Sequence, residues 1–221
     1  MTTAYQDIRR RIDAAAQRAG HAVLLLAVSK TKPAAAVRAL AAQGQRAYGE
    51  NYVQEALGKQ RELADPGLEW HLIGPLQSNK CREVAAHFDW LQTLDREKLV
   101  APLDRYRAAD APPLNVLIQV NIDGEASKSG CAPETVPPLA QRVAAATHLR
   151  LRGLMAIPEP KPDPAARRGA FRRMRDLYNA LKSTFPQVDT LSMGMSEDFE
   201  LAIEEGATMV RIGTALFGRR D

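Results

Sequence analysis

The sequence predicts an α/β protein, a single (β/α)8 barrel (TIM barrel) preceded by one extra helix. Eight apolar, strand-like segments alternate with helical segments along the chain. Each strand with its following helix takes about 25 residues, which is typical of this barrel. The 221 residues are also a common length for such a barrel as one domain. We therefore expect residues 1–221 to form a single domain.

The predicted strands are short and rich in Val, Leu and Ile, as buried strands are. They cover residues 23–29, 46–49, 70–74, 90–94, 115–122, 149–157, 190–195 and 209–212. The segment 115–122 is apolar almost throughout instead of alternating. This pattern indicates a parallel strand that is covered on both faces.

Segments with helical periodicity fill the intervals between these strands. Helices are predicted at residues 33–43, 52–63, 79–88, 96–108, 133–147, 165–184 and 197–205. Pro33 suits a first helical turn, and Asp95 and Ser196 can cap the helices that follow them. Gly44 and Gly206 suit helix ends.

A further helix, residues 3–18, precedes the first strand, whereas little chain follows Phe217. We expect this leading helix to cover the place that a closing helix would otherwise fill. An open, doubly wound sheet is the alternative fold, but its usual G-x-G-x-x-G turn is missing after the first strand. The proline-rich residues 158–164 are interpreted as a stiff loop within one domain, because the alternation resumes beyond them.

The composition describes a globular protein, with 45% hydrophobic and 5% aromatic residues and a net charge of +4. Residues 22–28, an early apolar run, are far too few to cross a bilayer, and the N-terminus does not resemble a secretory signal. Cys81 and Cys131 form no spaced pair, which favours a reducing cytoplasm. We expect no metal site, no membrane contact and a monomer, since no exposed apolar stripe indicates an oligomer.

A cluster of arginines in the helix predicted at 165–184 could suggest a nucleic-acid site. Apolar residues recur every three or four positions in this helix, so the arginines are expected on its opposite, solvated face. The one aromatic residue between them, Phe171, belongs to the apolar series, so no aromatic group accompanies the basic face and we expect no nucleic-acid partner. The cluster comprises Arg167, Arg168, Arg172, Arg173 and Arg175.

Lys30 is the first candidate functional residue, because it stands where the first strand gives way to a loop. An amine held there is partly desolvated, which favours its neutral, nucleophilic form and suits imine chemistry with an aldehyde. A strand-end lysine that extends into water is the plainer interpretation. Lys32 competes with it, but Pro33 forces Lys32 into an extended, solvated loop. We favour Lys30.

The last strand supplies a complementary set of groups. Arg211, Gly213 and Thr214 combine a guanidinium, bare backbone N–H groups and a hydroxyl, which could receive a phosphate dianion. Ser196 could add a second hydroxyl, although a role as helix cap is favoured on local grounds. Active groups of these barrels collect at the carboxyl ends of the strands, and phosphate commonly sits after the seventh and eighth.

Six ordered motifs resemble the pyridoxal phosphate homeostasis protein family, also called the YggS-like family. They lie at residues 27–33 (AVSKTKP), 49–55, 70–80, 153–157, 191–196 and 210–218. The resemblance covers residues 24–219 and implies a barrel similar to the N-terminal domain of alanine racemases. It also implies pyridoxal 5′-phosphate (PLP) as cofactor.

Carried over residue by residue, the resemblance implies that Lys30 forms a Schiff base with PLP. It implies phosphate contacts at Ser196, Gly213 and Thr214, and places Asn51 beside the ring and Arg211 at the pyridine nitrogen. It assigns no roles to His71, Gln77, Asn79 or Lys80. Residues 127–130, which include Lys128, could form a second phosphate contact, although a solvated loop is favoured.

A guanidinium that only donates leaves a pyridine nitrogen unprotonated, so the ring is a poor electron sink and transamination is disfavoured. Racemisation needs proton donors on both faces of the substrate α-carbon. The racemases that this barrel resembles take one of these donors from a second domain. We expect no such domain here, because the chain ends at Asp221. We therefore expect a carrier that buffers or delivers PLP, with PLP-dependent apoenzymes as possible recipients and little or no turnover. A minimal amino-acid racemase and a cofactor-independent enzyme acting on a sugar phosphate are the alternatives.

Overall fold

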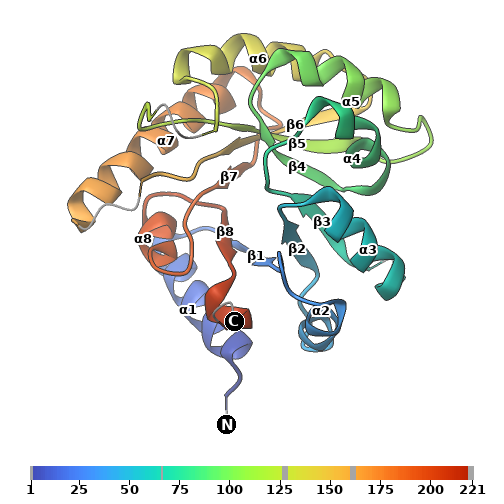
Figure 1. The fold of residues 1–221 in the computed structure, drawn as a ribbon. Helices are drawn as coiled ribbons and strands as arrows, with labels where there is room; N and C mark the ends of the chain where they lie inside the picture. Colours follow the sequence, from blue (N-terminus) through green and yellow to red (C-terminus); the bar gives the residue numbers. More distant parts are fainter. Residues whose placement is uncertain (1, 66, 126–128, 160–162, 219–221) are drawn as a thin grey trace.

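Eight parallel strands close into a barrel in chain order, and β8 pairs with β1 (Figure 1). The computed structural model describes residues 2–65, 67–125, 129–159 and 163–218. The strands are β1 (Leu24–Val28), β2 (Ala47–Glu50), β3 (Glu69–Leu72), β4 (Trp90–Leu94), β5 (Leu114–Gln119), β6 (Leu149–Met155), β7 (Thr190–Ser192) and β8 (Met209–Ile212). The closed barrel is confirmed, and the open sheet is excluded.

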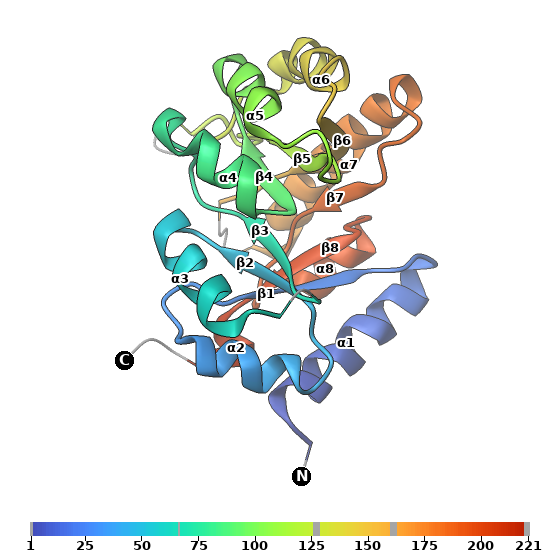
Figure 2. The ribbon, with the colours of Figure 1, turned by 90° about the vertical axis from the view of Figure 1, so that its right-hand side faces the viewer.

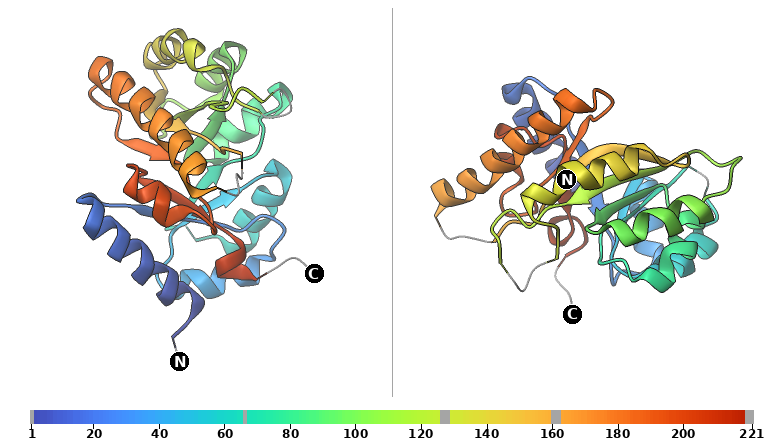
Figure 3. Two further views of the ribbon diagram at one scale, coloured as in Figure 1. Left: turned by 90° about the vertical axis from the view of Figure 1, so that its left-hand side faces the viewer. Right: turned by 90° about the horizontal axis from the view of Figure 1, so that it is seen from above.

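Helices connect these strands on the outside of the barrel, and the long helix α7 is the most conspicuous of them (Figures 1 and 3). The α-helices are α1 (Ala4–Ala19), α2 (Ala34–Ala41), α3 (Val53–Leu63), α4 (Cys81–His87), α5 (Val100–Tyr106), α6 (Val136–Ala144), α7 (Pro164–Thr184), α8 (Phe199–Glu204) and α9 (Thr214–Phe217). Short 3-10 turns, η1 (Ser78–Lys80), η2 (Glu97–Leu99) and η3 (Pro133–Thr135), precede α4, α5 and α6. Within the described part of the chain, no helix has the length and hydropathy that a bilayer span requires.

The strand and helix positions agree with the sequence prediction, but several boundaries differ. β5, β6 and β7 end two or three residues early, because the chain turns into loops that carry polar groups of the barrel mouth. The proposed caps were wrong in detail. Pro33 stands just before α2, Asp95 pairs with Arg96, and Asp198, not Ser196, directly precedes α8.

The leading helix α1 packs against α8 and the short α9, beside the point where β1 meets β8 (Figures 1 and 2). Ile8, Ile12 and Ala15 form its buried face. Arg11 donates two hydrogen bonds to Glu200 of α8, at 3.1 and 3.0 Å. The predicted leading helix is therefore present, and it covers the barrel beside the β1–β8 junction.

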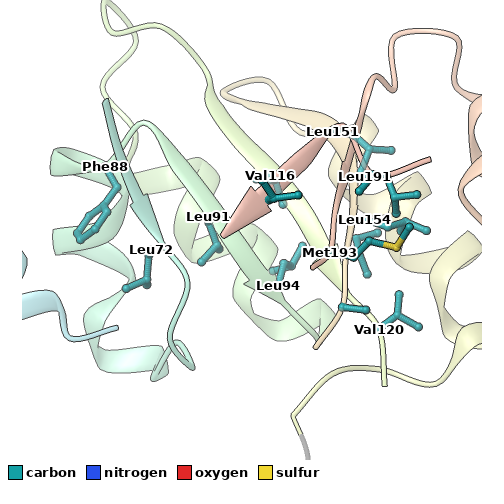
Figure 4. Close-up of a cluster of buried hydrophobic side chains, with 14 of the residues drawn as sticks. Leu72, Phe88, Leu91, Leu94, Val116, Val120, Leu151, Leu154, Leu191 and Met193 are labelled. Atoms are coloured by element: carbon teal, nitrogen blue, oxygen red, sulfur yellow. The ribbon is translucent and has the colours of Figure 1, made fainter. Parts of the chain in front are cut away.

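Most of the apolar core lies between the strands and the surrounding helices. Figure 4 shows part of this layer, in which Leu91 of β4 lies beside Val116 of β5, its register partner. Small apolar groups occupy the barrel interior, one of them made of Leu26, Ala47 and Met209. The remainder of the interior is partly polar, and this polar part carries the site described below.

The arginines of α7 lie on its solvated face, as predicted, but four of them also form ion pairs with other elements. Arg168, Arg172 and Arg175 all bind the buried carboxylate of Glu205, at distances from 2.7 to 3.3 Å. Arg173 pairs with Asp123 at 2.9 Å. Burial alone would raise the pKa of Glu205, but the hydrogen bonds from Arg168 and Arg172 lower it overall. Arg168, Arg172 and Arg175 therefore join α7 to the end of α8, and Arg173 joins it to the loop after β5.

Gly153 is expected to tolerate no side chain. Its φ of +149° disfavours other residues, and a Cβ atom would clash with the carbonyl oxygen of Thr190 on the neighbouring strand. Gly153→Ala should lower the free energy of unfolding by on the order of 3 kcal/mol. Gly58→Ala, at an open position in α3, should instead raise it by up to about 1 kcal/mol. Urea unfolding measures both, and equal stabilities would contradict this view of the β6–β7 contact.

Glu205 should contribute to stability only while it is ionised. Because its pKa is lowered in the folded state, its contribution is present above the ordinary glutamate pKa of about 4.3 and is lost as pH falls below it. The stability difference between wild type and Glu205→Gln should therefore shrink between about pH 5 and pH 3. Glu204→Gln, at an exposed neighbour, is the control and should differ little from wild type at any pH.

Candidate functional site

A cavity of about 530 Å³ opens at the carboxyl ends of the strands. Its described lining comprises Val28, Lys30, Asn51, Ile73, Ile157, Pro158, Arg167, Met195, Ser196, Glu197, Asp198, Arg211, Gly213 and Thr214. All six residues singled out from the sequence, Lys30, Asn51, Ser196, Arg211, Gly213 and Thr214, are among them. The fold thus brings together positions that are up to 184 residues apart, from Lys30 to Thr214.

Strand alternation explains why Lys30 and Arg211 reach this cavity. Leu26 lies in the barrel interior and Val28 lines the cavity, so Lys30 continues the inward-facing series of β1. On β8, Met209 and Arg211 share the inward series in the same way. Ser29 has the opposite parity and faces the surrounding helices. Lys32 does not belong to the described lining of the cavity.

The backbone around Lys30 forms a tight turn that is held from outside the barrel. The N–H of Lys32 donates to the carbonyl oxygen of Ser29 at 3.0 Å, and Thr31 adopts a left-handed φ of +64°. Lys59 of α3 donates to the same Ser29 oxygen at 2.7 Å. Glu55, also of α3, accepts from the Thr31 N–H. Both neighbours of Lys30 are therefore fixed by one helix.

Lys59 is itself the centre of a buried ion cluster. Its ammonium lies 2.7 Å from Glu50 and 2.6 Å from Glu55, and its side chain is only 7% exposed. Ser29 also donates to Glu50, at 2.6 Å. Burial raises the pKa of Glu50, and the donors Lys59 and Ser29 oppose this effect. Because isolated buried charges are costly, the three charged side chains depend on one another.

Arg211 is buried beneath the cavity and is anchored twice. Its Nη1 donates to the Ser192 hydroxyl at 2.7 Å, and its Nη2 donates to the carbonyl oxygen of Ala156 at 2.8 Å. Burial lowers the pKa of Arg211 to about 10, and Asp198 opposes this shift, so the guanidinium keeps its charge at neutral pH. No carboxylate among the described residues forms an ion pair with it.

Ser196, Gly213 and Thr214 lie together because β8 pairs with the loop after β7. The Arg211 N–H donates to the carbonyl oxygen of Gly194 at 3.0 Å, and Asp198 accepts from the Met195 N–H at 2.7 Å. Ser196 thus sits within a turn at the cavity wall, not at the helix start. Gly213 directly precedes α9 and Thr214 begins it, and the first N–H groups of a helix have no acceptor within that helix. These groups can bind an anion.

Asn51 is positioned by a close backbone approach. A Cβ atom at Gly74 would clash with the carbonyl oxygen of Asn51, so only glycine allows the loop after β3 to pass there. Thr93 holds this loop by donating to the Gly74 oxygen at 2.7 Å. The amide of Asn51 therefore stays at the cavity wall.

Sequence reasoning missed several cavity residues. Val28, Ile73, Ile157 and Met195 form its apolar walls, and Arg167, assigned to a solvated face, also lines it. The inward parity of Val28 and Ile73 could have identified them, whereas Arg167 follows a loop whose course the pattern did not predict. Gln77, Asn79 and Lys80 lie outside the described lining, in or next to η1. Lys128 and residues 160–162 of the proline-rich loop fall outside the described residues.

A second cavity, of about 850 Å³, opens at the amino ends of the strands. Glu69, Trp90, Arg152, Asp189 and Met209 are among its lining residues. Catalytic and binding groups of (β/α)8 barrels gather at the carboxyl mouth. The smaller cavity, which contains Lys30, is therefore the candidate site.

Comparisons with known proteins point in one direction. Residues 4–221 match the family model described as "Alanine racemase, N-terminal domain". The chain is 59% identical to the pyridoxal phosphate homeostasis protein of Pseudomonas aeruginosa, covering 100% of this chain and 97% of the relative. It is 53% identical to the protein of that name from Escherichia coli, with 97% and 94% covered. The structure of PipY from Synechococcus elongatus with PLP bound superposes with a TM-score of 0.83 at 38% identity, covering 95% of this chain and 99% of that one.

Lys59→Met should be strongly destabilising, because it leaves the carboxylates of Glu50 and Glu55 without their buried partner. We expect a loss of about 3 to 5 kcal/mol in the free energy of unfolding, measured by urea denaturation. Lys98→Met, at an exposed position, is the matched control and should change it by less than about 0.5 kcal/mol. Adding Glu50→Gln to Lys59→Met should recover part of the loss. Similar stabilities for the two lysine variants would refute the role of the cluster.

Proposed function

The chain belongs to the alanine racemase N-terminal domain family and, within it, to the pyridoxal phosphate homeostasis proteins, and we propose that it binds PLP reversibly through Lys30. PLP would supply an aldehyde, and the amine of Lys30 would hold it as a Schiff base, with water released on binding and taken up again when PLP is released. In this proposal, residues 1–221 are one PLP-binding barrel domain that buffers or delivers the cofactor.

The main observation in support of PLP binding is that a single cavity contains an amine, a set of anion-binding donors and a buried cation. Lys30 lies at its wall, and Ser196, Gly213 and Thr214 offer hydroxyl and N–H donors for a phosphate. Arg211 lies beneath the cavity with a permanent charge, suited to donate to a pyridine nitrogen. Asn51, Val28 and the apolar walls fit a flat ring between these ends. The volume of about 530 Å³ suits a small cofactor.

The donor set of the cavity supports holding the cofactor more than turning over a substrate. A racemase needs a second group that carries a proton at neutral pH on the far face of the substrate α-carbon. Apart from Lys30, the titratable residues in the described lining are Arg167, Glu197, Asp198 and Arg211. Arginine does not release its proton, and Asp198 already accepts a hydrogen bond from the Met195 N–H, so this set is poorly suited to that role.

Binding of PLP would also prevent side reactions of its aldehyde, because free PLP reacts with cellular amines. We propose a cytoplasmic monomer that serves PLP-dependent apoenzymes, and the free thiols Cys81 and Cys131 are in keeping with a reducing compartment. The family likeness to racemases keeps a minimal PLP-dependent amino-acid racemase as the competing function.

Lysine trapping tests the site. After PLP is added, wild type should develop a Schiff-base absorption band, and borohydride reduction followed by peptide mapping should find the label on Lys30. Lys30→Ala should lose both signals, because its nucleophile is gone. Lys32→Ala is the control and should keep them. Loss of the band in Lys32→Ala with retention in Lys30→Ala would move the assignment to Lys32.

Proton exchange separates the carrier from the racemase. We expect PLP-loaded wild type to leave the α-protons of common amino acids unexchanged in D₂O, as followed by proton NMR, because the described part of the cavity lining offers no second proton donor suited to the reaction. An alanine racemase treated in the same way is the positive control. Exchange that depends on Lys30 would establish turnover and contradict the carrier proposal.

A further inference from the structure

We propose that residues inside the barrel position Arg211 through one oriented chain of hydrogen bonds that runs to the opposite mouth. This interior chain consists of Arg211, Ser192, Gln92, His71 and Glu69. It would determine how firmly Arg211 meets the pyridine end of the cofactor, and in this respect it rests on the proposed function.

Each link of the interior chain has good hydrogen-bond geometry. Arg211 donates to the Ser192 hydroxyl at 2.7 Å, and Ser192 donates to the amide oxygen of Gln92 at 2.8 Å. The amide nitrogen of Gln92 lies 2.9 Å from Nδ1 of His71. Nε2 of His71 lies 2.7 Å from a carboxylate oxygen of Glu69.

The hydrogen bonds of the interior chain can run in only one donor-to-acceptor direction. A guanidinium can only donate and an ionised carboxylate can only accept, so the two ends fix the intermediate groups. Ser192 accepts from Arg211 and has one proton to give to Gln92. The Gln92 amide nitrogen also lies 3.1 Å from the Met209 sulfur, which supports its assignment as the donor end. His71 then accepts at Nδ1 and carries its proton on Nε2.

The environment keeps His71 in that form. The ring is fully buried and stacks on Trp90, with centroids 5.0 Å apart and planes 7° apart. Burial lowers the pKa of His71, with Glu69 opposing, so the neutral ring prevails. Burial would raise the pKa of Glu69, but its bond with His71 lowers it overall and keeps the carboxylate ionised.

The interior chain of hydrogen bonds reaches from one cavity to the other. Arg211 lines the cavity at the carboxyl ends, whereas Glu69 lines the cavity at the amino ends, where its side chain is 41% exposed. Ser192, Gln92 and His71 between them are completely buried. Among the described residues, the guanidinium of Arg211 has two anchors, the interior chain and the Ala156 oxygen, so removal of the distant carboxylate should loosen it.

The experiment replaces the distant end of the chain and measures PLP at the near end. Glu69→Ala should raise the PLP dissociation constant by between about twofold and thirtyfold and shift the absorption band of the bound cofactor. Glu69→Gln retains an acceptor for His71 and should restore most of the affinity. Asp189→Ala removes a carboxylate of the same mouth that lies outside the chain, and should behave as wild type.

A double variant distinguishes positioning of Arg211 from general stabilisation, because the losses of PLP affinity should not add if both residues act through the interior chain. Ser192→Ala breaks the chain beside Arg211, so adding Glu69→Ala to it should have little further effect on PLP affinity. Nitrogen-15 NMR of the protein without PLP provides an independent readout. Wild type should show a neutral His71 protonated at Nε2, and the Arg211 guanidinium signals should change in Glu69→Ala but not in Asp189→Ala.

Unchanged PLP affinity, spectrum and Arg211 signals in Glu69→Ala, with PLP still trapped on Lys30, would overturn the interior chain alone. Additive losses in the double variant would likewise overturn it and leave a structural role. Failure of wild type to trap PLP at Lys30 would overturn the proposed function itself, whatever the NMR signals show.

Discussion

The buried ammonium group of Lys59 constrains the backbone on which the candidate site depends. It holds the Ser29 carbonyl oxygen and, through Glu55, the Thr31 N–H, so the residues on both sides of Lys30 are fixed by α3. The left-handed Thr31 costs conformational energy that this cluster offsets. Lys30 can therefore reach into the barrel mouth from a turn that would otherwise be free to move.

Apolar and polar side chains share the interior of the barrel. Apolar side chains such as Leu26 and Met209 fill part of it, and Gln92 and His71 occupy positions of the same inward parity. Buried polar groups of this kind are stable only when each has a partner. Gln92 finds its partners on two other strands, in Ser192 and His71, whereas His71 also bonds to Glu69 of its own strand. The same hydrogen bonds that satisfy the interior also fix the orientation of the groups at the mouth.

The sequence was sufficient to predict the closed barrel, the order of its elements and the six cavity residues, because strand ends and glycine or lysine positions are local signals. Glu55 and Lys59 are an i,i+4 pair within α3 and form a local pattern, but the buried cluster was not predictable, since Glu50 joins them only when β2 and α3 are packed. The interior chain joins four strands and has no local pattern at all. Ser196 was misjudged as a helix cap because α8 begins later, after a turn closed by Asp198.

The docking of α1 on α8 and α9 has a consequence for biosynthesis. The ribosome releases α1 long before its packing surface exists, because α8, β8 and α9 follow it in the chain after seven strands and six helices. Ile8, Ile12 and Ala15 therefore lack their final packing partners during most of translation. The same holds for β1, whose neighbour β8 is synthesised about as late. Barrel closure is thus a late, long-range event, and the nascent chain passes through aggregation-prone states that a chaperone would shield.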